Sequence, residues 1–346
     1  MINLEKEIRE QPETIKNLKQ TALPAIKKAV EEAKARGVKY VYFAARGTSE
    51  HACIYAQYLI QTEIGLPCAL ATPSVLTKYN GKLCLKDALV IGVSQSGAAE
   101  DVMAILKRAK ECGAMTIGIT NTEGSLIAET ADNHIYLGVG KENSIAATKT
   151  FTAQLAVMTL LCAEWTGSKE LSENFDKLPE AVKTLLDTVP AQIEAMINDF
   201  KELEGGVVLG RGYNYPIALE GALKIMETNR INMRGYAMAE FYHGPFAQLT
   251  DGGNVFLLAS DGAMYEDSKA ILEKLRTTPS RIVIVSDNPE ICNNCRYSIK
   301  IPNLGSDILS PYMFVIAMQL FALKLTEVKG IDPDKSEVIK KVTVTK

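Results

Sequence analysis

The chain has 346 residues, of which 47% are hydrophobic and 23% are charged, and its formal net charge at pH 7 is −3. This length suffices for two domains of ordinary size, and the composition is typical of a globular protein with a substantial core. Basic and acidic side chains are well mixed, so the sequence offers no basic field for nucleic acid and no polybasic patch for a membrane. We therefore expect no nucleic acid and no membrane among its partners.

The N-terminus and the cysteines predict a cytoplasmic protein. The first residues, MINLEKEIREQ, carry acidic side chains early and no apolar core segment, unlike a secretory signal. The longest apolar stretches, near residues 151–163 and 312–325, contain polar residues and fall short of the roughly 20 apolar residues of a membrane span. The seven cysteines are scattered, as expected for reduced thiols. Cys292 and Cys295 form a single CxxC, which indicates either loop or strand-edge thiols or a zinc or redox site.

In the first half of the chain, amphipathic stretches alternate with short apolar runs. Residues 4–36 are amphipathic and rich in Glu and Lys, which predicts a solvated helical arm or, alternatively, an arm exchanged within a dimer. Alternation of strand and helix farther along predicts a mostly parallel sheet with helices on both faces. The expected strands are 39–45, 88–93, 114–120 and 134–137, and the expected helices are 50–64, 99–110 and 147–165.

The same alternation begins again in the second half. The Arg46-Gly47 and Arg211-Gly212 turns occupy matching places after the first strand of each half, which indicates a duplicated α/β unit. The strands expected here are 206–209, 254–259, 281–286 and 297–301, and the helices are 216–229, 266–275 and 311–326. The predicted domains are a helical arm (1–36), a first α/β domain (37–167), a linker of packed helices (168–204), a second α/β domain (205–330) and a C-terminal tail (331–346).

Two polar turns in the first half point to anion binding. ARGTS (residues 45–49) and SQSG (residues 94–97) each follow an expected strand and precede an expected helix. Parallel sheets bind ligands at the carboxyl ends of their strands, and helix N-termini favour anions. Hydroxyl and amide groups donate to phosphate, while glycine lets the backbone approach it closely. The alternative is that these serines and threonines only cap helices, but two such turns at equivalent edges favour phosphate binding.

Other ligand classes lack support in the sequence. No GxGxxG follows either first strand, which argues against a dinucleotide site, and no GxxxxGK[ST] occurs that would form a P-loop. We expect no cofactor, and no cluster of side chains predicts a metal.

Candidate acid–base residues lie in the second half. Lys224 and Glu227 are three residues apart in an expected helix and share a face, where the alternative is an ordinary surface ion pair. His243 precedes Gly-Pro in an expected turn, which favours a histidine positioned to act as an acid or base over a structural one. His134, by contrast, looks like a strand-edge residue. In the tail, apolar spacing suggests docking that brings Lys340 to a substrate carbonyl as a Schiff-base donor or ring-opening partner, and the alternative is a frayed basic end.

Together these motifs resemble those of the phosphosugar-isomerase (SIS) domain family, from about residue 46 to residue 344. The segments that carry the resemblance are ARGTS, VSQSGAAED, AATKTFTAQ, GRGYNYPIALEGALKIMET, EFYHGP and KKVTVT. The match is nearest to the isomerase half of glucosamine-6-phosphate synthase and to SIS-type glucosamine-6-phosphate deaminases. The resemblance implies two tandem SIS domains in a homodimer, each a mostly parallel sheet flanked by helices in a three-layer sandwich.

The resemblance also implies roles for individual residues. It makes Glu227 the proton-shuttling base with Lys224 as its helper. It makes His243 the ring-opening residue, supplied across the dimer interface, and Lys340 the lysine that meets the open-chain sugar. The substrate phosphate is assigned to Thr48, Ser49, Ser94, Gln95 and Ser96, and further substrate contacts to Arg46, Gly47 and Ala147.

Several positions depart from the synthase pattern. Arg46 stands where the synthase has cysteine, which fits the deaminase-like relatives better. Ala99 replaces the threonine that follows SQSG, and Ala147 replaces the serine before TKxFT. The chain begins Met1-Ile2 without a glutaminase domain or its N-terminal cysteine, so we expect that it does not draw ammonia from glutamine.

The resemblance therefore predicts a glucosamine-6-phosphate deaminase, which converts glucosamine 6-phosphate into fructose 6-phosphate and ammonia by ring opening and a C1/C2 proton transfer. Two alternatives use the same base and acid: a deglycase acting on a fructosamine 6-phosphate, and simple aldose–ketose isomerisation. A non-catalytic sugar-phosphate sensor is the alternative from another class. The presence of Glu227, His243 and Lys340, without an added helix-turn-helix segment, favours an enzyme.

Overall fold

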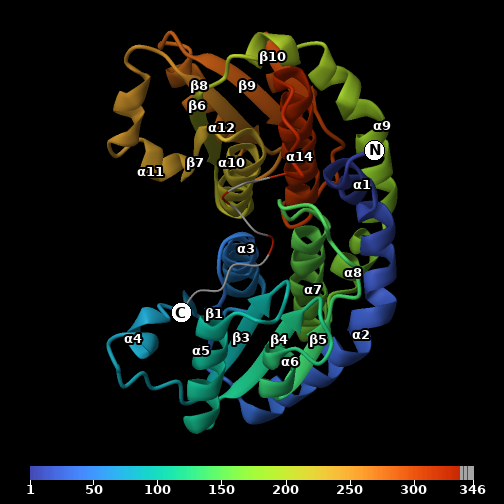
Figure 1. Ribbon diagram of the computed structural model, residues 1–346, viewed down its shortest axis with the longest axis vertical. Helices are drawn as coiled ribbons and strands as arrows, with labels where there is room; N and C mark the ends of the chain where they lie inside the picture. Colours follow the sequence, from blue (N-terminus) through green and yellow to red (C-terminus); the bar gives the residue numbers. More distant parts are fainter. Residues whose placement is uncertain (336–337, 339–340, 342–346) are drawn as a thin grey trace. The chain divides into compact units, whose positions relative to one another are not determined.

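Two compact units make up the chain, each built on one parallel sheet (Figure 1). The structure is a computed structural model that describes residues 1–335, 338 and 341. Unit A comprises Glu13–Glu142 and Lys149–Glu173, together with Lys341. Unit B comprises Met1–Pro12, Asn143–Thr148 and Asn174–Ile339.

The sheet of unit A has the strand order β2-β1-β3-β4-β5, with every pairing parallel. Every residue of β3 and β4 is buried, as expected for parallel strands covered on both faces. Helix α3 packs against α7, and α5 packs against α6. Right-handed crossovers place α3 and α5 on opposite faces, because β1 and β3 lead to strands on opposite sides. The bounds are β1 Tyr40–Ala44, β2 Cys68–Leu70, β3 Ala88–Ser94, β4 Met115–Thr120, β5 Asn133–Tyr136, α3 Thr48–Glu63, α4 Ser74–Thr77, α5 Glu100–Glu111, α6 Leu126–Thr130 and α7 Lys149–Thr166.

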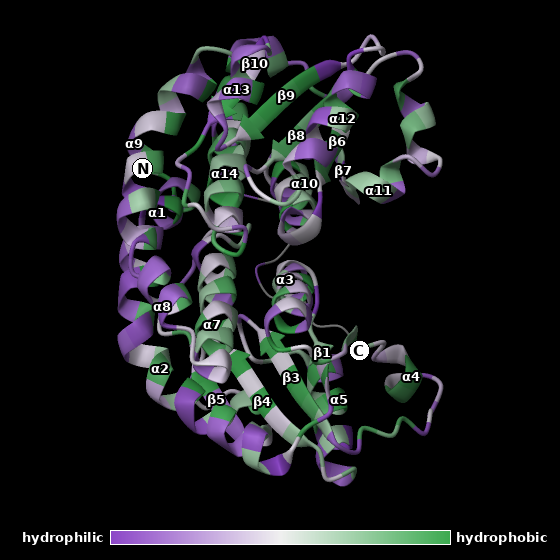
Figure 2. Ribbon diagram, turned by 180° about the vertical axis from the view of Figure 1, so that it is seen from behind, coloured by the Kyte–Doolittle hydropathy of each residue, from purple (hydrophilic) through white to green (hydrophobic). Residues whose placement is uncertain are grey.

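The sheet of unit B has the order β10-β9-β8-β6-β7 and is also entirely parallel. Helix α10 packs against α14, while α12 and α13 contact β8 and β9. In Figure 2 strand β9 is hydrophobic along most of its length, whereas α9 carries hydrophilic stretches. The bounds are β6 Gly205–Gly210, β7 Asn232–Ala237, β8 Asn254–Ala259, β9 Arg281–Ser286, β10 Tyr297–Lys300, α8 Lys169–Phe175, α9 Leu178–Glu194, α10 Tyr215–Asn229, α11 Met238–Phe241, α12 Tyr265–Leu275, α13 Pro289–Asn293 and α14 Ser310–Lys329.

The two sheets share one topology, which supports the duplication indicated by the sequence. In each sheet the first strand lies between the second and the third, so the strand order reverses there. An arginine after the first strand also pairs with an aspartate in the first turn of the helix that follows the third strand. Arg46 Nε lies 2.6 Å from Asp101 Oδ2, and Arg211 Nη1 lies 3.3 Å from Asp267 Oδ1.

Two edge strands, β2 and β7, were not expected from the sequence. Strand β2 has only three residues and follows Pro67. Strand β7 reads NMRGYA, and its side chains are mostly exposed or half-buried. Strand β2 is too short and β7 is too polar to show the apolar run of a central strand, and an edge strand pairs on one side only.

The N-terminal region is helical as predicted, but one side of it is buried instead of forming a solvated arm. Helix α1 (Asn3–Arg9) packs against α14 through Leu4 and Ile8. In helix α2 (Gln11–Arg36), Ile15, Leu18 and five further apolar residues are buried: Ala22, Ile26, Ala29, Val30 and Ala33. Their spacing of three and four residues accounts for the amphipathic pattern of the sequence.

Helix α14 is long and apolar enough to cross a membrane by length and composition, with a mean hydropathy of 1.3. However, 83% of the 18-residue stretch that has this hydropathy is buried inside the protein. It is the core helix of unit B, where Phe321 packs edge-on against Phe256 and Phe200.

The turn after β8 is the counterpart of the SQSG turn, but it carries carboxylates. The Asp261 N–H donates to Asp287 Oδ1 at 2.7 Å, and the Ala263 N–H donates to Asp307 Oδ2 at 3.1 Å. The Asp261 carboxylate accepts hydrogen bonds from the side-chain amides of Asn288 and Asn303, both at 3.0 Å. Three carboxylates at one turn disfavour a bound anion there.

Asp287 is 6% exposed, and its burial raises the pKa of its carboxyl group to about 6. The charges of Asp261 and Asp307 raise it as well, against the effect of the backbone N–H donors. The folded protein therefore binds this proton more tightly than the unfolded chain. The resulting stabilisation is complete below about pH 4 and is lost as the pH rises through about 6.

We expect Asp287→Asn to raise the free energy of unfolding at neutral to alkaline pH by about 2–3 kcal/mol, because two pKa units correspond to about 2.7 kcal/mol. Below about pH 4 the variant and the wild type should be equally stable, since the wild-type group is then neutral too. Urea unfolding at both pH values measures this, with the exposed Asp251 changed to Asn as the control. A variant no more stable than wild type at alkaline pH would contradict the raised pKa.

Candidate active site

The polar turns of unit A lie at the point where its strand order reverses. ARGTS follows β1 and SQSG follows β3, and these two strands are neighbours in the sheet. Ligands of doubly wound sheets bind at the carboxyl ends of such a pair of strands. Gly47 and Gly97 have φ angles of 54° and 68°, which residues with a Cβ rarely adopt. The structure thus brings the predicted phosphate-binding turns to one edge.

Within SQSG, the two serine hydroxyls accept backbone hydrogen bonds. Ser94 Oγ accepts the Gly97 N–H at 3.2 Å, and Ser96 Oγ accepts the Ala98 N–H at 3.4 Å. In the described part of the chain, no hydrogen bond uses the proton of either hydroxyl. Each hydroxyl can therefore donate that proton to a phosphate oxygen.

Ser49 is fixed by a residue that the sequence analysis did not single out. Its hydroxyl oxygen accepts a hydrogen bond at 3.0 Å from the side-chain amide of Gln154, which lies on α7 and is 1% exposed. Thr48 and Ser49 are the first two residues of α3, whose N-cap, Gly47, provides no side-chain cap. A buried glutamine inside an apolar helix was the available signal, because a buried amide needs a polar partner.

Arg46 was predicted to contact substrate, and it is engaged within the protein. Its guanidinium pairs with Asp101, which is 6% exposed and lies in the first turn of α5. The pair ties the turn after β1 to the helix after β3, so it helps hold the two polar turns together.

In unit B, helix α10 carries a chain of three charged side chains along one face. Lys224 Nζ lies 2.6 Å from Glu227 Oε2 and 3.3 Å from Glu220 Oε1. Glu220 and Lys224 are 0% and 1% exposed, whereas the Glu227 side chain is 23% exposed. Lys224 and Glu227 share a helix face, as predicted, and they form an ion pair. Because Lys224 is buried, this pair differs from the ordinary surface ion pair given as the alternative. Glu220 was missed, although its spacing of four residues from Lys224 was the signal.

The charge of Lys224 is maintained by its two partners. Burial opposes the charged form, but the carboxylates of Glu220 and Glu227 outweigh it and raise the pKa of Lys224 above its ordinary value. Lys224 therefore stays an ammonium group at physiological pH.

His243 and Ala147 also belong to unit B. His243 is exposed in the turn between α11 and the 3-10 helix Pro245–Leu249. Among the described residues, no hydrogen bond or ion pair joins it to Glu227. Ala147 follows a segment held by Glu7, a buried glutamate of α1 that the sequence analysis missed. The Glu7 carboxylate accepts the N–H groups of Asn143 at 2.5 Å and Ser144 at 3.1 Å.

The tail is only partly described, and Lys340 lies outside the described residues. Val338 is 91% exposed, and the docking of the tail stays a prediction. In unit A, Lys341 Nζ lies 2.8 Å from Glu142 Oε2, an atom that also accepts the Thr150 hydroxyl at 2.7 Å. Glu142 is buried, so it is a second glutamate with a structural role that the sequence did not reveal.

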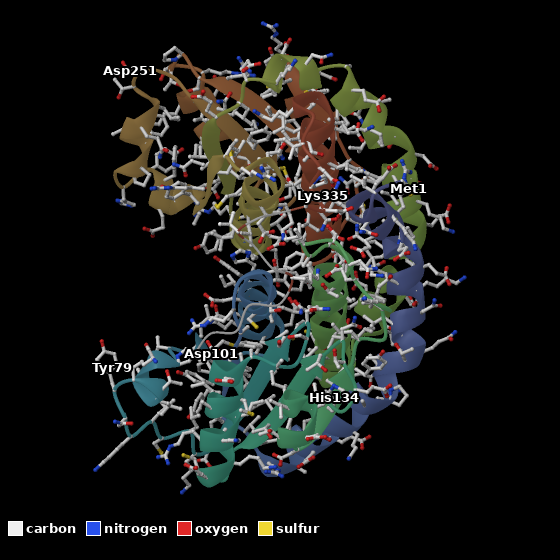
Figure 3. All side chains as sticks on the ribbon, viewed as in Figure 1. Met1, Tyr79, Asp101, His134, Asp251 and Lys335 are labelled. Carbon is white, nitrogen blue, oxygen red and sulfur yellow. The ribbon has the colours of Figure 1, made fainter. Side chains whose placement is uncertain are left out.

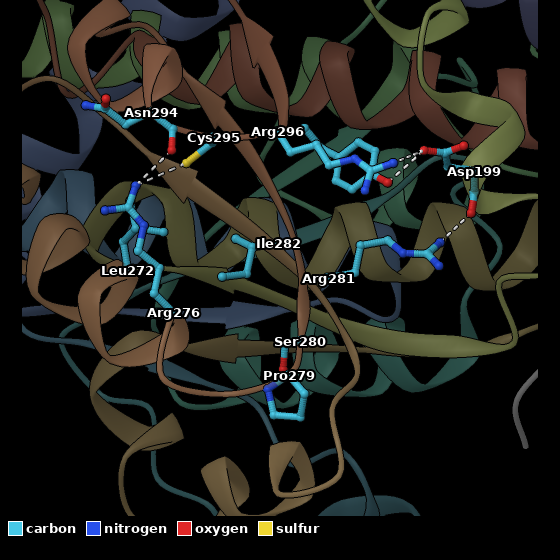
Figure 4. A pocket seen from close by; sticks show the side chains of 11 residues that line it. Asp199, Leu272, Arg276, Pro279, Ser280, Arg281, Ile282, Asn294, Cys295 and Arg296 are labelled. Carbon is cyan, nitrogen blue, oxygen red and sulfur yellow. Dashed lines mark hydrogen bonds and ion pairs between the residues drawn. The ribbon is translucent and has the colours of Figure 1, made fainter.

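A separate cavity of about 650 Å³ lies in unit B at the amino ends of β9 and β10 (Figure 4). Its three arginines are engaged by the protein: Arg281 and Arg296 with Asp199, and Arg276 with the sulfur of Cys295 at 3.6 Å. The cavity lies at the edge opposite the carboxyl ends of the strands, so it is not the candidate site.

The CxxC pair shows the features of structural thiols. Cys292 is 1% exposed, and burial raises the pKa of its thiol to about 11. Among the described residues, no group of three or more His, Cys, Asp or Glu side chains could hold a metal ion. These observations favour loop or strand-edge thiols over a zinc or redox site.

The doubly wound sheets, with a polar carboxyl edge in unit A, define an α/β protein with a candidate anion-binding site. The SIS domain family matches two stretches of the chain, residues 34–163 and 206–328, one in each half. These stretches make up well over half of the chain, which belongs to the SIS domain family.

Among its curated relatives is the glutamine–fructose-6-phosphate aminotransferase (isomerizing) of Thermococcus kodakarensis, which is 32% identical over 350 residues. The alignment covers 98% of this chain and 57% of that enzyme. The chain thus spans a little over half the length of such relatives.

Solved structures show the same fold. The C-terminal domain of glucosamine-fructose-6-phosphate aminotransferase from Francisella tularensis has a TM-score of 0.85 and 24% identity, covering 96% of this chain and 98% of that chain. Glucosamine-6-phosphate deaminase from Thermotoga maritima has a TM-score of 0.80 and 24% identity, covering 99% and 100%. At these identities the likeness concerns the fold alone.

Proposed function

We propose that this protein is a glucosamine-6-phosphate deaminase, which converts glucosamine 6-phosphate and water into fructose 6-phosphate and ammonia. The observation that carries the proposal is the Glu220–Lys224–Glu227 chain on α10. It combines a carboxylate that reaches the surface with a buried charge system that keeps this carboxylate oriented.

Glu227 suits the role of a base that shuttles one proton. The three side chains together carry a charge of −1, and they become neutral as a group when Glu227 accepts a proton. Glu220 keeps Lys224 paired throughout, so protonation of Glu227 does not leave an isolated buried ammonium. A single carboxylate can serve two adjacent carbons, because its oxygens reach both.

In the proposed reaction, His243 assists opening of the sugar ring, and Glu227 removes the proton from C2 of the open-chain aldehyde. Return of that proton to C1 leaves a C=N bond at C2. Water adds to this carbon, and ammonia leaves with the electron pair of the C–N bond. The products are fructose 6-phosphate and ammonia, and no electrons are exchanged with an outside partner.

The proposal assigns phosphate binding to Thr48, Ser49, Ser94, Gln95 and Ser96 of unit A. The assignment is supported by two hydroxyl protons of SQSG that no described acceptor uses. It is also supported by the N-terminus of α3, where the N-cap residue Gly47 has no side chain to occupy the anion position. A phosphate held there orients the flexible open chain, which lowers the entropic cost of reaching the transition state. Arg46 helps hold the two polar turns together through its ion pair with Asp101. Gly47, Ala147 and Lys340 keep their proposed substrate contacts.

The alternatives differ in substrate or in turnover. A fructosamine-6-phosphate deglycase would use the same base and release an amine or amino acid, and an aldose–ketose isomerase would release no ammonia. A sugar-phosphate sensor would bind without turnover. Incubating the purified protein with glucosamine 6-phosphate and with fructosamine 6-phosphates, and following ammonia and hexose phosphate separately, distinguishes the deaminase from the deglycase. A parallel incubation with fructose 6-phosphate, followed for an aldose phosphate, reveals an isomerase, and binding without turnover of any of these compounds identifies a sensor. Homodimer formation, with His243 supplied across the interface, stays a prediction of the resemblance. The cytoplasmic location stays a prediction from the N-terminal residues and the cysteines.

Glu227→Gln should lower kcat by at least about a thousandfold, since the amide cannot take up the C2 proton, while binding of glucosamine 6-phosphate changes less than about fivefold. Single-turnover assays and calorimetric titration measure the two quantities. The control is Glu266→Gln, because Glu266 pairs with Lys269 at the same three-residue spacing but is 82% exposed. Turnover at the wild-type rate in the Glu227 variant would remove this residue from the mechanism.

Ser96→Ala should raise KM for glucosamine 6-phosphate about tenfold or more and leave kcat nearly unchanged, because a hydroxyl donor to a charged phosphate is lost. Steady-state kinetics measure both constants. Ser74→Ala, an exposed serine at the start of α4, serves as the control. An unchanged KM would speak against phosphate binding by SQSG.

A further inference from the structure

His134 lies on the edge strand β5 of unit A, outside every role assigned so far (Figure 3). Its Nε2 atom lies 2.8 Å from Thr120 Oγ1 at the end of the neighbouring strand β4. Thr120 is fully buried, and its hydroxyl donates to the Thr122 carbonyl at 2.8 Å. Since a hydroxyl has one proton, the imidazole N–H is the donor to Thr120. The Nε2–H group of His134 can therefore donate to Thr120 whether or not Nδ1 is also protonated.

The segment that begins at Thr120 is hydrogen-bonded to the SQSG loop. The Asn121 N–H donates to the Gln95 carbonyl at 3.0 Å, and the Ile127 N–H donates to the Gly97 carbonyl at 3.1 Å. These bonds fix both loop carbonyls to the segment of residues 121–127. The backbone of residues 121–127 thereby defines the path of the loop.

Ser125 lies between the hydroxyl of Thr120 and Gly97 of the SQSG loop. Its Oγ lies 3.5 Å from Thr120 Oγ1 and caps helix α6 by accepting the Ala128 N–H. A Cβ added at Gly97 would lie 2.1 Å from the same Oγ atom. A shift of Ser125 would therefore displace the loop, because the two are in direct contact.

We propose that His134 is a positioning residue for the SQSG loop, which it holds through Thr120 and the 121–125 turn in the conformation that binds a sugar phosphate. The inference rests on the proposed function, in which this loop binds the phosphate. His134 itself touches no substrate atom and acts only through the hydrogen bond that it donates.

Two substitutions of His134 test the role of that donor. Gln supplies a side-chain N–H that can replace the imidazole donor, whereas Leu supplies none. We expect His134→Leu to raise both the Kd for inorganic phosphate and the KM for glucosamine 6-phosphate about 5- to 20-fold, with kcat changed less than about twofold. His134→Gln should stay within about threefold of wild type in all three constants. Equal binding by the two variants would overturn the proposal.

A matched pair of threonine substitutions controls for the loss of a buried hydroxyl. Thr116 is also fully buried on β4, and its hydroxyl donates to Asp132 at 2.9 Å, but it lies near the amino end of the strand. Thr116→Val and Thr120→Val delete the same kind of group from the same strand. We expect only Thr120→Val to weaken phosphate binding, and equal phosphate Kd values would overturn the proposal.

Ser96→Ala separates failure of this inference from failure of the proposed function. If Ser96→Ala binds inorganic phosphate as well as wild type, the loop is not the phosphate site, and both the phosphate assignment of the proposed function and the positioning role of His134 fall. If Ser96→Ala weakens binding while His134→Leu and Thr120→Val bind like wild type, only the positioning role is overturned.

Discussion

An ammonium group buried on helix α10 requires opposite charge, and Glu220 and Glu227 supply it from positions one turn to either side. Removing a charge from water is unfavourable by several kcal/mol unless a partner compensates for it. Glu220, which is fully buried, balances the charge of Lys224 by itself, so Glu227 can take up a proton without leaving an unpaired buried ammonium group. Glu227 is held at the exposed end of the chain, which is where a base must be to reach a substrate.

The doubly wound sheet provides a second constraint, since the carboxyl ends of its strands converge where the order reverses. Both units have this edge, but the two edges differ in chemistry. In unit A the turn after the third strand carries hydroxyls whose own protons no described acceptor uses. In unit B the corresponding turn donates its N–H groups to Asp287 and Asp307. A duplicated scaffold thus offers an anion a favourable edge in one unit and a repulsive edge in the other.

Support for the polar edge of unit A comes from residues whose own chemistry is unremarkable. Gln154 donates to Ser49, Asp101 pairs with Arg46, and the turn that includes Ser125 holds the backbone of SQSG. Each contact joins segments that are distant along the chain. Precise placement of a small ligand depends on such supporting contacts, because the residues that touch it cannot fix their own orientation.

Local sequence patterns were enough to predict the central strands, their alternation with helices, the duplication, the polar turns and the shared helix face of Lys224 and Glu227. These features follow from local periodicity and spacing, which act within a few residues. Other features depend on packing between distant segments. They are the edge strands β2 and β7, the burial of one side of α2, the burial of Lys224 between its two carboxylates, and the contact of His134 with Thr120. Each depends on which distant segment packs alongside, and the free energy of burial or of a hydrogen bond is set by that neighbour, which no local pattern specifies.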